Sequence, residues 1–168
     1  MIAALQGRVR RFGNDINTDY VISSKRKRET IDSAVLKQWL FEGVDPAFAA
    51  SVRTGDLIVA GRNFGCGSAM EVAVTVILAA GIRAVLAESF SRTFFRNAIN
   101  NGLIPVQCDT ARLGEGDHIA LETDDGRFAV RNRSSGESVV GAPLSGIVLD
   151  ILEAGGLVPY VLAHKGLG

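Results

Sequence analysis

A short glycine-rich segment, residues 61–71 (GRNFGCGSAME), carries the residues best suited to chemistry. It follows an apolar run at 56–60, which predicts a buried strand, and precedes an apolar run at 72–80, which predicts a buried helix ended by Gly81. Ser68 would then lie at a helix N-terminus, where unpaired N–H groups and the helix dipole stabilise a carboxylate or phosphate. The segment therefore predicts an anion-binding turn with a serine hydroxyl beside the anion.

Other patterns compete for the same residues. Ser68 and Glu71 have the spacing of a capping box, in which each side chain bonds the backbone N–H of the other residue, and capping alone would explain both. The dinucleotide-binding pattern fails because Met70 stands where it requires glycine or alanine. A phosphate-binding P-loop is excluded because no Lys-Ser or Lys-Thr pair follows. The sequence pattern alone therefore allows two roles for Ser68, as a helix cap or as part of an anion-binding site.

Composition narrows the class of protein. With 47% hydrophobic and 21% charged residues, residues 1–168 suit a single globular domain. The net charge of +0 argues against a nucleic-acid partner, and no apolar run approaches the roughly 20 residues that span a bilayer. The N-terminus lacks a signal-peptide pattern, and two cysteines, Cys66 and Cys108, favour the reducing cytoplasm. Two cysteines cannot hold an iron–sulfur cluster, which needs about four ligands, so we expect no metal on this chain.

The order of the expected elements indicates a mixed α/β fold. Strands are expected at residues 6–12, 56–60, 83–87 and 103–107, with helices between the last three. Strands that alternate with helices imply parallel strands with crossover connections. An Asp-Gly pair at 125–126 between alternating runs predicts an antiparallel hairpin. We therefore expect an α/β domain whose parallel part carries an antiparallel hairpin appendage.

Three other segments complete the expected organisation. Residues 23–30 (SSKRKRET) are polar and basic and are expected to form an exposed loop. Asp32 or Ser33 can cap a helix that continues to Phe41. A helix over 145–154 is followed by a short packed tail at 157–162.

Three motifs, in order and spacing, resemble those of one enzyme family. Residues 13–19 (GNDINTD) are similar to G-D-x-x-D-T-D, and residues 61–68 (GRNFGCGS) to the start of G-x-N-F-G-x-G-S-S-R-E-H-A. Residues 87–98, followed by 101–103, are similar to A-x-S-F-x-x-I-F-x-x-N and N-x-G. Together they resemble the small subunits of 3-isopropylmalate dehydratase, in the aconitase superfamily. The match runs from about residue 7 to residue 106, and the remainder fits in length and pattern only.

The resemblance implies a fold, a reaction and a partner. The fold would be the aconitase-type swivelling β/β/α domain, and the reaction would dehydrate and rehydrate a 2-hydroxy di- or tricarboxylic acid. A [4Fe–4S] cluster would belong to a separate large subunit, over which this chain swivels. Ser68 is by position the catalytic base, and Asp19 either orients a catalytic neighbour or forms a turn. Gly65 and Gly67 would let substrate approach the backbone closely.

The chain departs from the motif just after these glycines. Where the family has Ser-Arg it has Ala69 and Met70, and a thioether cannot bind the substrate carboxylate that the arginine binds. Another basic residue could reach that carboxylate, an apolar substrate group could pack on Met70, or dehydratase activity could be lost. Counting from Asp19, Arg28 falls where homoaconitase-like members carry an arginine for the distal carboxylate. Arg28 could therefore compensate, unless it is only a solvated surface residue.

The leading hypothesis is thus a hydro-lyase subunit that works with an iron–sulfur large subunit. 3-Isopropylmalate, from leucine biosynthesis, is the default substrate, and dimethylmalate, citramalate and homoaconitate-type substrates stay open. The alternative hypothesis is that the chain is no enzyme subunit but a non-catalytic binding module of the same fold. In that case Ser68 could be replaced by alanine without loss of function. A partner-facing surface left exposed would favour homo-oligomers of the isolated chain.

Overall fold

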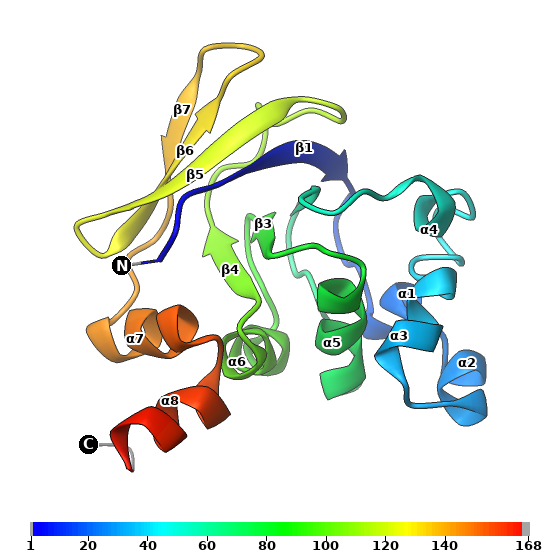
Figure 1. The fold of residues 1–168 in the computed structure, drawn as a ribbon. Coiled ribbons are helices and arrows are strands. Elements are labelled where there is room, and N and C mark those ends of the chain that lie inside the picture. The colour runs from blue at the N-terminus through cyan, green and yellow to red at the C-terminus, as the bar shows by residue number, and fades with distance from the viewer. Residues whose placement is uncertain (1, 166–168) are drawn as a thin grey trace.

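A computed structural model describes residues 2–165, which contain a seven-stranded sheet in the order β4-β3-β2-β1-β5-β6-β7 (Figure 1). β1 to β4 are parallel, and β5 to β7 are antiparallel. The strands are β1 Leu5–Arg11, β2 Leu57–Ala60, β3 Ala84–Ala87, β4 Ile104–Gln107, β5 His118–Asp124, β6 Arg127–Asn132 and β7 Ser138–Val140. The predicted α/β class with parallel strands and an antiparallel hairpin is confirmed. The hairpin is no separate appendage, because β1 pairs with both β2 and β5.

Most helices lie along the lower side of the sheet in Figure 1, with α1 to α5 on the right and α7 and α8 on the left. They are α1 Thr18–Val21, α2 Ser24–Glu29, α3 Ser33–Leu36, the 3-10 turn η1 Lys37–Trp39, α4 Phe48–Ser51, α5 Glu71–Ala79, α6 Arg92–Asn101, α7 Gly146–Ala154 and α8 Leu157–His164. Within residues 2–165 no single helix is long and apolar enough to cross a membrane. Only α7 and α8 together, as a pair bent by 95°, meet that requirement on length and composition.

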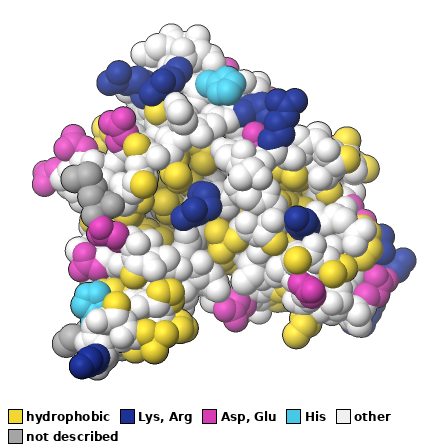
Figure 2. Space-filling view, in the orientation of Figure 1, with side chains coloured by type: hydrophobic (Ala, Val, Ile, Leu, Met, Phe, Trp, Pro, Cys, Tyr) yellow, Lys and Arg dark blue, Asp and Glu magenta, His cyan; other side chains and the backbone are white. Residues whose placement is uncertain are grey.

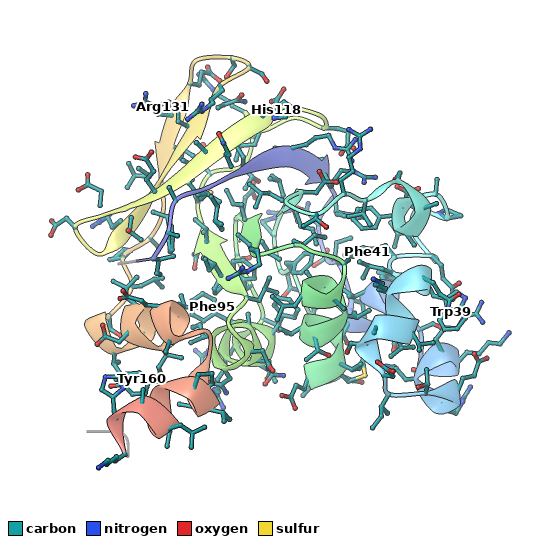
Figure 3. The ribbon with its side chains drawn as sticks, viewed as in Figure 1. Trp39, Phe41, Phe95, His118, Arg131 and Tyr160 are labelled. Atoms are coloured by element: carbon teal, nitrogen blue, oxygen red, sulfur yellow. The ribbon has the colours of Figure 1, made fainter. Side chains whose placement is uncertain are left out.

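The short parallel strands are buried on both faces, and each face has its own core. Ile58 and Val85 point into a cluster with α3 and α5. Their neighbours Leu57 and Leu86 point to the opposite face, into a cluster with β5, β6 and α7. Strands covered on both sides read as continuous apolar runs, which explains the sequences LIVA and AVLA. In Figure 3 Phe41 lies among the packed elements, where its ring stacks on Phe12 at 4.2 Å between centroids.

The basic segment predicted as an exposed loop instead forms helix α2. Ser23 caps this helix, since its hydroxyl accepts a hydrogen bond from the Arg26 N–H at 3.4 Å. Lys and Arg favour a helix because their straight side chains lose little rotamer freedom there. Contacts outside the helix also stabilise it, since the Arg26 guanidinium stacks on Trp39 at 4.3 Å and donates a hydrogen bond to Glu42 at 3.0 Å. The helix buries none of its residues, so no apolar period marked it in the sequence.

Two other predicted segments differ in extent. Asp32 caps α3 as predicted, but α3 ends at Leu36 and continues only as the turn η1. The tail predicted at 157–162 is the helix α8, which starts after Gly155 and Gly156, with φ of 90° and 129°. Pro159 fits there because the first turn of a helix needs no N–H donor.

A buried charge cluster ties β1 to the turn before β2. The Asp56 carboxylate accepts hydrogen bonds from the Arg8 guanidinium at 2.7 Å and from the Arg53 N–H at 2.9 Å, and Arg10 lies 3.6 Å away. Burial by itself raises the pKa of Asp56. The bond from Arg8, the bond from Arg53 and the charges of Arg8 and Arg10 outweigh it, so the pKa lies below its ordinary value.

We therefore expect an acid-dependent loss of stability that involves Asp56. Because its folded-state pKa is the lower one, the stabilisation is present above the unfolded-state pKa of about 4 and is lost as pH falls through the folded-state value. Urea unfolding between pH 7 and pH 3 should show that Asp56→Asn is less stable than wild type at pH 7 and loses less free energy of unfolding on acidification. Asp124→Asn, exposed on β5, should follow wild type. Equal pH slopes for wild type and Asp56→Asn would refute the assignment.

Candidate functional site

The segments that follow β1 and β2 are hydrogen bonded to each other beyond the ends of the strands. Both strands are parallel, so their carboxyl ends meet at the same edge of the sheet, where α/β proteins place their sites. Three backbone bonds of 2.8 to 2.9 Å join the two segments: Asp15 N–H to Arg62 O, Gly65 N–H to Ile16 O, and Thr18 N–H to Cys66 O. The first two predicted motifs, at 13–19 and 61–68, therefore form one unit.

The segment after β3 joins the same unit. Phe64 donates its N–H to the carbonyl of Ser89, and Ser91 returns its N–H to the carbonyl of Phe64, both at 3.0 Å. The Ser91 hydroxyl caps α6 through the Phe94 N–H at 3.2 Å and donates to the carbonyl of Gly65 at 2.8 Å. The third motif thus braces the glycine-rich segment, and the three motifs lie together in space.

Gly65 and Gly67 both have a positive φ, of 81° and 89°. A Cβ on Gly65 would lie 2.2 Å from Cγ of Phe94, and a Cβ on Gly67 would lie 2.5 Å from Oδ1 of Asn17. Positive φ and close approach both make a residue with a Cβ unfavourable at these positions. The groups that approach the two glycines here belong to this chain itself.

Ser68 does not cap a helix, so the capping-box prediction is wrong. Helix α5 begins at Glu71, its N-cap is the extended residue Met70, and no side chain bonds the cap. The positive φ of Gly67 and the extended Met70 prolong the turn beyond Ser68. The carbonyl of Ser68 accepts a hydrogen bond from the Thr18 hydroxyl at 2.9 Å. Its own hydroxyl is exposed and has no hydrogen-bond partner in the described part of the chain, which leaves it available for chemistry.

Asp19 lies beside this turn and holds a cation. Asn17 caps α1 through the Asp19 N–H at 2.8 Å. The Asp19 carboxylate accepts hydrogen bonds from the Ser24 hydroxyl at 2.9 Å and from Lys27 Nζ at 3.2 Å. These two bonds, that of Ser24 first, lower the pKa of Asp19. Lys27 Nζ also contacts the Met70 sulfur, so Asp19 is connected to Met70 through Lys27.

Two other predicted residues lie at the surface. Ala69 is exposed in the turn. Arg28 is exposed on α2, and its side chain makes no ion pair or hydrogen bond with any residue from 2 to 165. Lys and Arg side chains mix with acidic ones over α2, at the right edge of Figure 2. The structure brings Lys27, which was not selected from the sequence, to the glycine-rich turn. Side chains one residue apart in a helix diverge by about 100°, and only the helical conformation assigns Lys27 and Arg28 to different directions.

Potential metal ligands are sparse. Within residues 2–165 no group of three or more His, Cys, Asp or Glu side chains is placed to hold a metal ion. Cys66 is half-buried in the turn and Cys108 is buried beyond β4, and both are free thiols. Burial, with a smaller effect from Asp109, raises the pKa of the Cys108 thiol to about 12, which makes it a poor metal ligand.

Comparison with known proteins places the chain in a family. The sequence profile of the aconitase C-terminal domain matches residues 11–111. The isopropylmalate/citramalate isomerase small subunit of Methanocaldococcus jannaschii is 40% identical over 96% of this chain and 95% of that one. The homoaconitase small subunit of the same organism is also 40% identical, over 96% and 93%. Further relatives at 40% to 44% identity are named 3-isopropylmalate dehydratase small subunits.

A solved structure agrees with the sequence comparison. The crystal structure of 3-isopropylmalate dehydratase from Methanocaldococcus jannaschii superposes with a TM-score of 0.91 at 39% identity, covering 97% of this chain and 96% of that one. The expected swivelling-domain fold is therefore confirmed. The chain belongs to the aconitase C-terminal domain family, as a small subunit of the 3-isopropylmalate dehydratase type.

Proposed function

We propose that this chain is the small subunit of a hydro-lyase that isomerises a 2-hydroxy dicarboxylic acid by dehydration and rehydration. The observation that carries the proposal is the braced turn that presents the unpaired hydroxyl of Ser68, in a family of enzyme subunits. 3-Isopropylmalate is the first proposed substrate, in leucine biosynthesis and in the cytoplasm.

In this reaction Ser68 would remove the proton from the carbon next to a substrate carboxylate. A serine alkoxide needs preorganised positive groups and exclusion of water. Because α5 begins only at Glu71, the N–H groups adjoining Ser68 are those of the turn and not of a helix. Ser68 is exposed in the isolated chain, so a second surface has to close over it.

A large subunit that carries a [4Fe–4S] cluster is the partner we propose for that closure. The cluster would supply a Lewis acid for the leaving hydroxyl and a substrate carboxylate. The two free thiols of this chain offer no cluster site. This chain would contribute the base, substrate-binding groups at Gly65, Gly67, Ala69 and Met70, and the closing motion.

The side chain of Met70 favours a substrate with an apolar branch. It packs against the core cluster that contains α5, so it presents an anchored apolar surface next to Ser68. An isopropyl group could pack on such a surface, which favours 3-isopropylmalate. Citramalate and homoaconitate-type substrates are the named substrates of relatives at similar identity, and dimethylmalate has the same chemistry.

The test is turnover by the complex of this chain with its cognate large subunit after anaerobic cluster repair. Isopropylmalate, citramalate, dimethylmalate and homocitrate would be compared by the absorbance of the unsaturated product. We expect the highest kcat/KM with 3-isopropylmalate. A stable, cluster-loaded complex without turnover of any of the four would favour the non-catalytic binding module.

Arg28 supplies a prediction for substrate binding. With the substrate that gives the highest kcat/KM in this test, Arg28→Ala should raise KM about tenfold. This is the lower end of the effect expected for a lost hydrogen bond to a charged group, and we choose the lower end because Arg28 is exposed. Lys25→Ala, exposed on the same helix, should leave KM within twofold. Steady-state kinetics of both complexes provide the comparison, and an unchanged KM in Arg28→Ala would show that this residue is only a solvated surface group.

A further inference from the structure

Lys27 is held at the glycine-rich turn by an incomplete set of partners. Its ammonium group carries three N–H donors. Within residues 2–165 it contacts one carboxylate oxygen, Oδ1 of Asp19 at 3.2 Å, and the sulfur of Met70. A thioether is only a weak acceptor. One of the three N–H donors therefore has no acceptor in this part of the chain, and a second faces the Met70 sulfur, which a substrate oxygen could readily replace.

The surroundings of Lys27 make a further anion favourable. Its side chain is only 14% exposed, whereas that of Asp19 is 49% exposed. The cation is thus largely removed from water, while much of the carboxylate that balances it faces solvent. A charge in such a place gains more from an added carboxylate than a fully solvated one, because screening is weaker.

Two contacts place this cation beside Ser68. Met70, which the ammonium touches, follows Ser68 by two residues. Asp19, which holds the ammonium, follows Thr18, whose hydroxyl bonds the carbonyl of Ser68 at 2.9 Å. The ammonium is therefore connected to this turn by two routes, directly through Met70 and indirectly through Asp19 and Thr18.

Within residues 2–165, two neighbouring cations of α2, Arg26 and Lys25, make no hydrogen bond or ion pair with the glycine-rich turn. The guanidinium of Arg26 bonds Glu42, pairs with Glu29 at 3.6 Å and stacks on Trp39, which lies at the outer edge of the molecule in Figure 3. Lys25 is exposed to solvent. Among the basic residues of this helix, Lys27 is the one that contacts the glycine-rich turn.

From these contacts we propose that Lys27 is a substrate-binding cation of this site in addition to Arg28, that it binds the substrate carboxylate next to Ser68, and that Asp19 is its positioning residue. The incoming carboxylate oxygen displaces the Met70 sulfur from the ammonium, and the methionine then contacts the apolar part of the substrate. The inference rests on the function proposed above and adds the group that recognises the acid.

Kinetics of the assembled, cluster-loaded enzyme test the proposal. Lys27→Met should raise KM at least about tenfold, as expected for a lost hydrogen bond to a charged group, and change kcat less than threefold. Lys27→Arg keeps the charge and should keep KM within about threefold. Lys25→Met is the matched control on the same helix and should behave as wild type. If Lys27→Met does not assemble, Lys27→Gln supplies the same comparison.

A double-variant cycle separates the roles of the two residues. Asp19→Asn should raise KM in the wild-type background and have no further effect when combined with Lys27→Met, because it acts through Lys27. Additive effects would overturn the positioning role, and an unchanged KM in Lys27→Met would overturn the role of Lys27. An inactive wild-type complex would instead overturn the proposed function itself, so the two failures are distinguishable.

Discussion

Replacement of Ser68 by alanine is expected to lower kcat of the assembled enzyme by about 10²- to 10⁴-fold, the usual contribution of a positioned base. KM should change little, because the lost group acts on the reacting proton and does not hold the acid. Stability should be unaffected, since the Ser68 side chain is exposed and its hydroxyl makes no hydrogen bond within residues 2–165. Steady-state kinetics with 3-isopropylmalate and thermal unfolding of both proteins provide the two measurements.

Ser145 offers a matched control for this substitution. It is an exposed serine at the start of α7, outside the three motifs, and its side chain caps no helix. Ser145→Ala should keep wild-type kcat. A Ser68→Ala enzyme with more than a tenth of wild-type kcat would remove Ser68 from the role of base.

Gly65→Ala should destabilise the fold by about 2–5 kcal/mol. The left-handed backbone costs a residue with a Cβ about 1–2 kcal/mol, and overpacking of a core costs about 1–3 kcal/mol. Both apply here, because φ is 81° and the new Cβ would lie 2.2 Å from Cγ of Phe94, which is 2% exposed. Urea unfolding of the isolated subunit measures the loss.

A substitution at Gly136 separates the cost of the left-handed backbone from the cost of overpacking. Its φ is also 81°, but a Cβ there would meet nothing within 4 Å. Gly136→Ala should therefore show the backbone cost alone, about 1–2 kcal/mol. Equal losses at the two positions would mean that the turn moves away from Phe94 without cost, and that Phe94 does not brace it.

Much of the fold could be predicted because its strands are short apolar runs bounded by turn residues. The Asp-Gly pair of the hairpin is one example: Asp125 and Gly126 both have positive φ, as a tight two-residue hairpin turn requires. Helix α2 could not be predicted in this way. Its stabilising contacts are polar and involve Glu42 and Trp39, which are distant along the sequence.

The sequence selects residues for the candidate site but does not give their arrangement in space. The motifs indicated Ser68, Asp19 and the glycines, and the structure brings these segments together. A helix cap at Ser68 was one open alternative because Ser and Glu three residues apart match the capping-box pattern, and nothing local showed that Met70 would be extended. Lys27 was missed because its partners, Asp19 and Met70, lie on two separate segments. Asn17 and Thr18 were within a recognised motif, but only the fold shows that they contact Gly67 and Ser68.

The double pairing of β1 has a consequence for biosynthesis. Its residue Val9 pairs with Leu57, and Leu5 pairs with Leu121, which is more than 100 residues further along the chain. β1 is synthesised before both of its partners and therefore keeps one unpaired edge until β5 has been made. Sheets built from such distant pairings fold slowly, and an unpaired edge is a template for aggregation. Correct maturation of this subunit should therefore depend on protection of β1 in the nascent chain, and a chaperone that binds Leu5–Arg11 would provide it.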